Sequence, residues 1–482
     1  MALIDTDKRP VICWFRRDLR VHDNPALCHA SSSGSPVIPL FVVDTELIAG
    51  IQSDGAVFDF QAECLRDLSQ SIETLGGRLI IRRGRLSEAL SRLARETKAE
   101  AVYFNRDYEP TALGRDRQAT DLLQSLGIEV KAFDDVVVHP PDDIRTAEGG
   151  PYTVFTPYAT KWRKLDKPKA AGAPSRFDTL RLASDPIPGA DALGRKTLIN
   201  NPALRGGETA ARNRWNSFLR DGLNKYDNLR DIPSANGTSM MSPYLRFGCI
   251  SPVRMYADLR GAWLDADENG RRAMAKYVDE LVWREFYTSV LYYFPFTAER
   301  NYRRMFDGFN WSFDSMTFAA WKEGRTGFPI VDAGMRQLNA TGWMHNRVRM
   351  VVASFLTKDL LVDWKKGEEY FSTKLLDMEK ASNVGGWQWA ASTGVDPRPL
   401  RIFNPALQSR RFDPDGTYIK NWVPELRQVP SRYIHEPSRM SAVLQKELGV
   451  IIGKDYSAPV VAHRDAATSF KRAYMSVKQV SR

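Results

Sequence analysis

The sequence predicts an α/β region followed by an all-α region. Short apolar runs alternate with helical patterns over residues 1–135, which is typical of a parallel sheet with helices on both faces. Residues 136–200 are rich in Pro, Gly and Asp and indicate a long connection over the surface. Residues 201–482 have a helical pattern almost throughout, with frequent Trp and Arg. A chain of 482 residues is long enough for this division into two or three domains.

Five short apolar runs predict the strands of a doubly wound, Rossmann-like parallel sheet. Between them, Leu65, Leu68 and Ile72 recur at helical spacing, and that helix is expected to end near Gly76. The same spacing predicts a second helix over residues 86–93. The expected strands are residues 11–15, 37–43, 78–83, 101–105 and 128–133.

The first strand is followed by Arg-Arg-Asp-Leu-Arg at residues 16–20. A dinucleotide-binding sheet has a glycine-rich GxGxxG turn at this place. Because that turn is absent here, we do not expect the sheet to hold the main nucleotide site.

Composition narrows the class of protein. No apolar run is long enough to span a membrane, and the first ten residues carry four charged side chains, so we expect no secretory leader and a cytoplasmic location. Lys and Arg exceed Asp and Glu by 68 to 58, a net charge of +10. This surplus alone is more typical of a solvated basic surface, although it also suits a polyanionic partner.

Cysteine and histidine usage argues against structural metals and disulfides. The four cysteines form no CxxC pair. No cysteine follows Cys249, which excludes an iron–sulfur cluster in the C-terminal half. The six histidines form no HExxH motif or close pair, so a zinc site is not expected.

Two segments of the helical half carry polar groups at helix positions. Ser242 is a suitable N-cap and Pro243 a suitable first helical residue, and hydroxyls near free helix amides suit a phosphate, although an ordinary cap has the same pattern. Residues 271–294 predict one long helix with Glu280 and Trp283 on one face. That face is either a solvated surface or a pocket wall for a planar polar ligand.

Two further segments follow. Residues 343–364 predict a second long helix, on which Trp343, Asn346, Arg347 and Met350 share a face. In residues 376–389 two glycines precede Trp-Gln-Trp, which indicates either a solvated loop or a backbone that comes close to a ligand.

Taken together, these segments resemble the photolyase/cryptochrome family. The most specific pieces are Gly-Trp-Met-His-Asn-Arg-Val-Arg-Met at residues 342–350 and Gly-Trp-Gln-Trp-Ala at residues 386–390. The resemblance covers nearly the whole chain, from residue 14 to residue 459. It implies an antenna-chromophore domain at residues 1–135, a linker at 136–200 and a helical FAD- and DNA-binding domain at 201–482. The likeness is strongest to bacterial cyclobutane pyrimidine dimer photolyases of class I or class III.

The resemblance implies a set of FAD-binding residues. Asp377 matches an acid that pairs with Arg349 beside the flavin, and Asn383 matches the residue that faces flavin N5. An amide there can donate or accept, so it suits forms of the flavin that carry a proton on N5. The implied cofactor contacts are Tyr226, Thr238, Ser239, Met241, Ser242, Arg284, Trp343, Asn346, Arg349, Asp377, Glu379 and Asn383.

The resemblance also implies catalytic and DNA-binding residues. Glu280 would bond the pyrimidine edge, and Trp387, Trp364 and Trp311 match a chain that carries electrons to the flavin. Together with Asn383, these are the implied catalytic residues. The implied contacts to DNA and to a flipped-out dimer are Arg230, Glu280, Trp283, Asn346, Arg347, Met350, Trp389 and Gln408.

The implied function is light-driven repair of cyclobutane pyrimidine dimers in DNA by a monomer without a metal or iron–sulfur cluster. The alternatives are a cryptochrome-like photoreceptor and a basic flavoprotein with thermal redox chemistry. Glu379 stands where the family often has Asp. Thr111-Ala112 and Ala298-Glu299 replace the usual antenna contacts, so the antenna site differs. A folate, 5,10-methenyltetrahydrofolate, is the expected antenna.

Overall fold

The computed structural model describes residues 8–174, 176–395 and 400–480. The chain divides into two compact units that are each built from several segments. Unit 1 comprises Met1–Thr197, Pro202–Asn224 and Ser239–Tyr293, and unit 2 comprises Leu198–Asn201, Lys225–Thr238 and Phe294–Arg482. The functional boundaries that we inferred from the sequence, at residues 135 and 200, stay a prediction.

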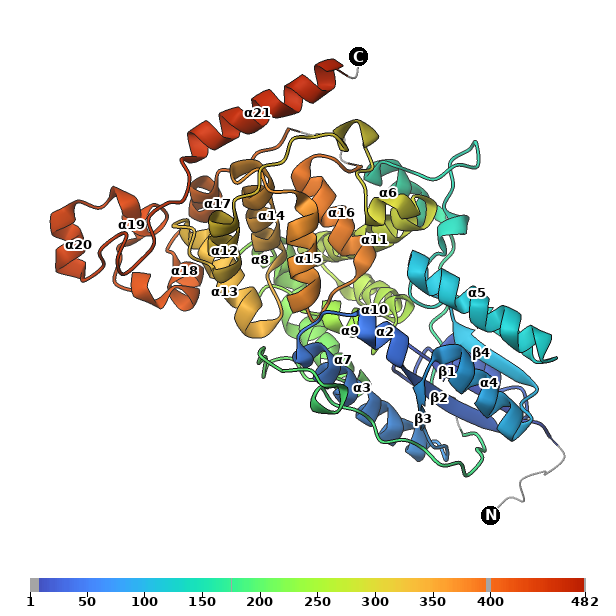
Figure 1. Ribbon diagram of the computed structural model, residues 1–482. Coiled ribbons are helices and arrows are strands. Elements are labelled where there is room, and N and C mark those ends of the chain that lie inside the picture. Colours follow the sequence, from blue (N-terminus) through green and yellow to red (C-terminus); the bar gives the residue numbers. More distant parts are fainter. Residues whose placement is uncertain (1–7, 175, 396–399, 481–482) are drawn as a thin grey trace. The chain divides into compact units, whose positions relative to one another are not determined.

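Unit 1 contains a five-stranded parallel sheet with the order β3-β2-β1-β4-β5 (Figure 1). All five predicted strands are confirmed, with ends that shift by at most two residues. The strands are β1 (Val11–Phe15), β2 (Val37–Asp44), β3 (Ile80–Gly84), β4 (Ala101–Asn105) and β5 (Glu129–Phe133).

Helices cover both faces of this sheet. Leu90 of α4 and Leu123 of α5 pack with Ile12, Trp14 and Val102, whose side chains share one face. Helix α1 contacts β1 and β4 without joining that cluster. The helices of unit 1 are α1 (Pro25–Ser31), α2 (Thr45–Gly50), α3 (Gly55–Thr74), α4 (Leu86–Thr97), α5 (Pro110–Ser125), α6 (Phe155–Lys164), α7 (Glu208–Ser217), α9 (Ser242–Phe247), α10 (Pro252–Asp265) and α11 (Glu268–Tyr293).

Charged side chains fill the carboxyl end of the sheet between β1 and β4, where the strand order reverses. Arg16 pairs with Asp116, and Arg17 pairs with Asp107 at 3.3 Å. Burial alone would raise the pKa of Asp107, but the charges of Arg17 and Arg16 lower it far below its usual range. The segment that replaces the glycine-rich turn is therefore a network of ion pairs.

We expected the connecting segment 136–200 to lie over the surface, because of its composition. The structure shows that part of it is buried. It contains α6, on which Tyr158 and Trp162 are fully buried. The indole Nε1 of Trp162 donates to Glu285 of α11 at 2.6 Å, and the amides of Val138 and His139 donate to the same carboxylate. Tyr158 and Trp162, one helical turn apart, thus anchor the segment together with the amides of residues 138 and 139.

Burial raises the pKa of Glu285 to about 7, against these three hydrogen bonds, which lower it. A carboxyl whose pKa is raised by folding stabilises the folded protein at pH values below its unfolded pKa of about 4.5. This stabilisation is lost as the pH rises toward 7. This loss is on the order of 3 kcal/mol.

We therefore expect the free energy of unfolding to fall more steeply between pH 4.5 and 7 in the wild type than in Glu285→Gln. Urea unfolding at several pH values measures the difference. The side chain of Gln carries an NH2 group, which would face the three N–H donors that now bond to Glu285. The variant should therefore be less stable at pH 7 by about 1–3 kcal/mol. Parallel pH profiles for the two proteins would contradict the raised pKa.

Unit 2 consists of helices around one large apolar core. Among the described helices of the whole chain, none has the length and apolar composition that crossing a membrane requires. The helices of unit 2 are α8 (Tyr226–Leu229), α12 (Ser315–Glu323), α13 (Pro329–Thr341), α14 (Asn346–Ser354), α15 (Trp364–Lys374), α16 (Lys380–Ala391), α17 (Pro405–Phe412), α18 (Thr417–Trp422), α19 (Ser431–Ile434), α20 (Ala442–Leu448) and α21 (His463–Val480) (Figure 1).

The prediction of one long helix over residues 343–364 is wrong. Helix α14 starts only at Asn346 and passes into a π-helical turn, Phe355–Asp359. Leu361 has a φ of 55°, which a right-handed helix cannot contain. Asp363 then caps α15 by accepting from the amide of Lys365 at 3.1 Å. The apolar spacing of the sequence continues across this break, which Leu361 and the Asp363 cap produce.

Residues 380–391 form helix α16, so Gly385 and Gly386 lie inside a helix and not in a loop. Each glycine costs about 1 kcal/mol in a helix relative to alanine. Packing compensates for this cost, because Trp387 of α16 lies directly against Gly367 of α15. A Cβ at Gly367 would come within 2.1 Å of the indole.

Candidate functional site

The candidate residues are distributed over both units, and we describe each group within its own unit. Unit 1 holds the turn before α9 and one face of α11. Unit 2 holds α8, the polar starts of α14 and α16, and the indoles of its core. Among the residues that the structure describes, no group of three or more His, Cys, Asp and Glu could hold a metal ion.

In unit 1, Ser242 is not the N-cap that we predicted. Met241 occupies the cap position without a side-chain hydrogen bond, because Met240 has a φ of 53° and turns the chain one residue earlier than expected. Ser239 holds this turn against α11, since its hydroxyl lies 2.7 Å from the hydroxyl of Tyr277. The turn therefore presents Ser242 at the first helical position.

Tyr277 connects the turn before α9 to Glu280. Burial raises the pKa of Tyr277 well above its usual value, the hydrogen bond with Ser239 opposes this, and the nearby charge of Glu280 adds to it. Glu280 is only half-buried and lies one turn after Tyr277 on α11. The structure thus places Glu280 and Ser239 around one phenol.

Trp283 has one covered face. Its ring stacks on Phe155 of α6 with a centroid distance of 3.6 Å and an angle of 1°, and Tyr287 lies 5.6 Å away. The indole remains half-buried, so a base can stack on at most its other face. Arg284, the next residue on α11, donates to the backbone oxygen of Val136.

In unit 2, the start of α14 gathers polar groups. His345 caps the helix through Nδ1, which accepts from the amide of Arg347 at 3.2 Å. Asn346 is exposed, and its Nδ2 lies 4.0 Å from the sulfur of Met350, so these two residues do share a face. Burial is the main cause that lowers the pKa of His345 to about 4, so its imidazole is neutral at pH 7.

Arg347 is held from two sides. It pairs with Asp231 at 2.9 Å, and its guanidinium lies 4.4 Å from the ring centre of Phe412. Arg349 pairs with Asp377 at 2.8 Å and donates from Nε to the backbone oxygen of Met344. The pairing of Asp377 with Arg349 that the resemblance implied is therefore confirmed.

Helix α16 presents Asn383 and Gly386 on one face, three residues apart and only half-buried. A Cβ at Gly386 would meet no atom of the described residues within 4 Å. Glu379 occupies the N-cap position of the same helix and accepts from Ser382 at 3.4 Å. This face can accommodate a flat group close to the helix backbone.

The three indoles of the implied electron chain belong to one core region. Trp387 and Trp364 are 2% and 0% exposed, whereas Trp311 packs against the same cluster and is half-buried. Trp364 donates to Asn301 at 2.9 Å. A further indole, Trp321, lies 6.1 Å from Trp387, and no motif had indicated it.

The other implied residues of unit 2 have these positions. Tyr226 is buried at the start of α8, with Arg230 stacked 5.9 Å above its ring. Trp389 lies 5.9 Å below the guanidinium of Arg401. Thr238 before the turn, Trp343 before α14 and Gln408 on α17 are half-buried.

Sequence reasoning missed Phe155, Glu368 and Lys380. Phe155 lies in a segment whose Pro, Gly and Asp content indicated a connection, although Phe155, Tyr158 and Trp162 recur at helical spacing. Glu368 is the first of two adjacent acids on α15, and the structure brings it to Asn383 at 2.9 Å and to Lys380 at 3.0 Å. A buried acid beside a motif asparagine has no sequence signal, because the contact depends on how α15 packs against α16.

Comparisons with known proteins agree with these features. A family model described as "DNA photolyase" matches residues 11–175, and one described as "FAD binding domain of DNA photolyase" matches residues 277–476. A deoxyribodipyrimidine photo-lyase of Agrobacterium fabrum is 40% identical over 98% of this chain and 99% of its own length. One from Synechococcus is 38% identical over 97% of each chain.

Solved structures show the same likeness over nearly the whole chain. A bacterial class III photolyase from Agrobacterium tumefaciens has a TM-score of 0.91 at 38% identity and covers 99% of this chain and 100% of its own. A cryptochrome from Synechocystis has a TM-score of 0.89 at 30% identity, over 96% and 99%. Both the α/β sheet and the helical FAD-binding part are thus accounted for, and the chain belongs to the photolyase/cryptochrome family as an enzyme with the FAD-binding domain of the DNA photolyases.

Proposed function

We propose that this enzyme repairs cyclobutane pyrimidine dimers in DNA, using light and reduced FAD. The observation that carries the proposal is the face of α16, where open space lies at Gly386 beside the half-buried Asn383, and the neighbouring Trp387 is buried. The likeness to photo-lyases over nearly the full length supports it.

The residues present fit FAD. The open space at Gly386 suits a flat ring system, and Asn383 is an amide on the same face. The Arg349–Asp377 pair offers a cation and an anion for polar ring edges. Hydroxyls at Thr238, Ser239 and Ser242 suit a pyrophosphate and a ribityl chain, with Tyr226, Met241, Arg284, Trp343, Asn346 and Glu379 as further contacts. When bound, reduced FAD supplies one electron after excitation by light.

The remaining residues receive roles toward the substrate. Glu280 is assigned to the pyrimidine edge, where a carboxyl can stabilise developing negative charge. Trp283 has one face left for a flipped base, and Trp389 offers another flat apolar surface. Asn346 and Met350 contribute an amide and a soft apolar contact on one face of α14. Trp387, Trp364 and Trp311 are assigned to electron supply for the resting flavin.

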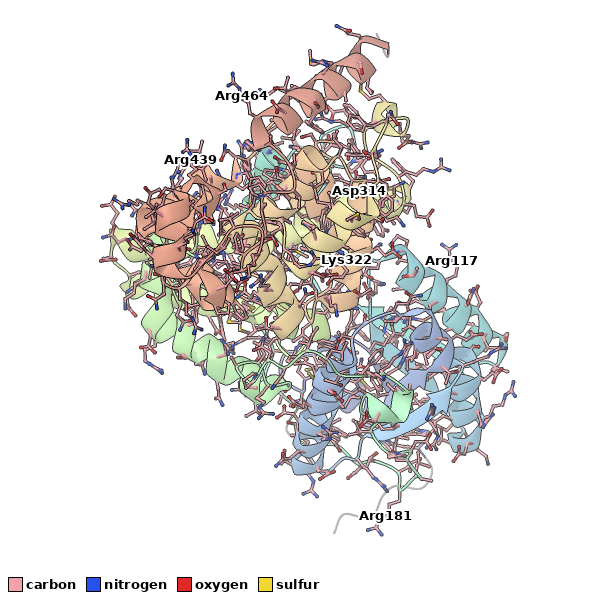
Figure 2. All side chains as sticks on the ribbon, turned by 60° about the vertical axis from the view of Figure 1, so that its left-hand side comes forward. Arg117, Arg181, Asp314, Lys322, Arg439 and Arg464 are labelled. Atoms are coloured by element: carbon pink, nitrogen blue, oxygen red, sulfur yellow. The ribbon has the colours of Figure 1, made fainter. Side chains whose placement is uncertain are left out.

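DNA is the polyanionic partner that we assign to the basic surplus. Arginines of both units extend outward, as Figure 2 shows for Arg117 and Arg181 of unit 1 and for Arg439 and Arg464 of unit 2. Arg230, Arg347 and Gln408 are assigned to the damaged strand. We propose that the protein acts as a monomer, and that the antenna is a folate.

DNA affinity should weaken as salt increases, because bound arginines and lysines displace counterions from phosphates. A slope of about −0.9 per phosphate contact is expected in a plot of log affinity against log salt. Fluorescence anisotropy with a dimer-containing duplex at several salt concentrations measures the slope. An affinity that does not change with salt would contradict the DNA-partner assignment.

The test of the proposed function is a repair assay on a dimer-containing oligonucleotide, in light and in darkness. We expect repair only in light and only with reduced flavin. The likeness to a cryptochrome structure makes a photoreceptor the second candidate. Stable light-induced changes in the flavin without any repair would favour it, and flavin-dependent turnover in darkness would favour thermal redox chemistry.

A further inference from the structure

Asn383 lies in a hydrogen-bond network between α15 and α16. Its Nδ2 donates to Glu368 Oε1 at 2.9 Å, to the backbone oxygen of Glu368 at 3.3 Å and to Ser372 Oγ at 3.1 Å. Each of these side-chain hydrogen bonds uses the nitrogen end of the amide. The protein therefore holds one end of the amide. Within residues 8–174, 176–395 and 400–480 no donor to the oxygen end is seen, so that end is available to another group.

The chemistry of the partners determines this orientation. Glu368 offers only acceptors to Asn383, so a flipped amide would place oxygen against oxygen. The same Oε1 also accepts from Lys380 Nζ at 3.0 Å and from Ser372 Oγ at 3.1 Å. Three donors converge on one carboxylate oxygen.

Lys380 is the ionic partner of the buried Glu368 carboxylate. The Glu368 side chain is 9% exposed and that of Lys380 is 29% exposed. A charge so far removed from water loses most of its hydration, and a charged partner with further hydrogen bonds offsets that loss. Without Lys380, Glu368 would be a weaker acceptor for Asn383.

We propose that Glu368 and Lys380 are positioning residues that hold the Asn383 carbonyl oxygen toward flavin N5. This inference rests on the proposed function, which places Asn383 beside N5. A carbonyl accepts a hydrogen bond from the N5–H of a reduced flavin, whereas N5 of the oxidised flavin is itself an acceptor. The pair therefore stabilises the reduced cofactor that repair requires.

A purely electrostatic role predicts something different. Removing only Glu368 would raise the flavin midpoint potential by removing a negative charge, and removing only Lys380 would lower it. Removing both leaves the net charge unchanged. Only the loss of amide orientation then remains to change the potential.

The test compares two charge-neutral double variants of the full-length protein loaded with FAD. Glu368→Leu/Lys380→Met removes the positioning pair. Lys366→Met/Glu369→Leu removes an exposed pair on the same helix, with an N–O distance of 3.8 Å, and serves as the matched control. Spectroelectrochemistry measures the midpoint potential, and the flavin absorbance of the purified protein measures FAD content.

We expect the first variant to retain FAD and to have a lower midpoint potential, with roughly a fivefold smaller ratio of reduced to oxidised flavin at a fixed potential. The control variant and the conservative variant Lys380→Arg should match the wild type. If the first variant loses FAD, Glu368→Gln/Lys380→Met is measured instead. A fall in potential is again expected, because a Gln amide can present either end to Asn383.

Asn383→Ala distinguishes failure of the inference from failure of the proposed function. If Asn383→Ala lowers the potential and both pair variants match the wild type, the positioning role is overturned and the place of Asn383 stands. If Asn383→Ala also leaves the potential unchanged, Asn383 does not face N5. The proposed flavin contact and the inference then fail together.

Discussion

Trp387→Phe is expected to abolish the light-driven reduction of bound oxidised FAD, while repair by the chemically reduced protein continues. Phe fills most of the space of this 2% exposed side chain but is much harder to oxidise than an indole. The measurement follows flavin absorbance under blue light with an added thiol as external electron donor. Photoreduction at the wild-type rate would remove Trp387 from the electron chain.

Trp321→Phe is the matched control for this substitution. Trp321 belongs to the same core, lies 6.1 Å from Trp387 and is 0% exposed, with its Nε1 bonded to the backbone oxygen of Val352 at 3.1 Å. We expect this variant to photoreduce its flavin normally. If both variants lose photoreduction equally, the loss reflects damage to the core or a route through Trp321, not a specific role of Trp387.

Substitutions of Glu280 are expected to lower the repair yield, which should be highest in the wild type, lower in Glu280→Gln and lowest in Glu280→Ala. All three proteins should retain FAD. Glu280→Gln keeps the shape and one donor but has no transferable proton, and Glu280→Ala removes both. Losing one hydrogen bond to developing charge should reduce the yield on the order of tenfold in Glu280→Ala. The measurement is dimers repaired per absorbed photon, together with flavin occupancy.

Asp279→Ala is the control for Glu280, because Asp279 precedes it on α11 and pairs with Arg163 of α6. This variant should repair at the wild-type yield. If Glu280→Ala repairs as well as the wild type, Glu280 is an ordinary solvated helix residue. If Glu280→Ala loses its flavin, the carboxylate supports the cofactor and does not act on the dimer.

Local sequence patterns predicted much of the fold. The five strands and α11 were predicted with ends within three residues, because hydrophobic alternation and helical spacing depend on residues at most about four positions apart. The motif at residues 342–350, through the family resemblance, also predicted the Arg349–Asp377 pair, which the structure confirms at 2.8 Å.

The same local patterns failed where one residue or one contact overrides them. The predicted helix 343–364 is interrupted at Leu361, although the apolar spacing continues on both sides. Gly385 and Gly386 left a solvated loop open as one of two interpretations, yet they are helical, and Trp387 of the same helix packs against Gly367. In both places the tertiary contacts supply free energy that local propensity does not contain.

By itself, then, the sequence predicted the five strands and several of the helices, and through the family resemblance it predicted which residues contact flavin and DNA. Only the tertiary structure decided what those residues touch. It covered one face of Trp283 with Phe155, bonded Trp162 to a glutamate 123 residues away, and placed Glu368 and Lys380 behind Asn383. These contacts join residues that are distant in the chain or lie on different helices. Their partners are therefore set by how the helices pack, and no local period or cap encodes them.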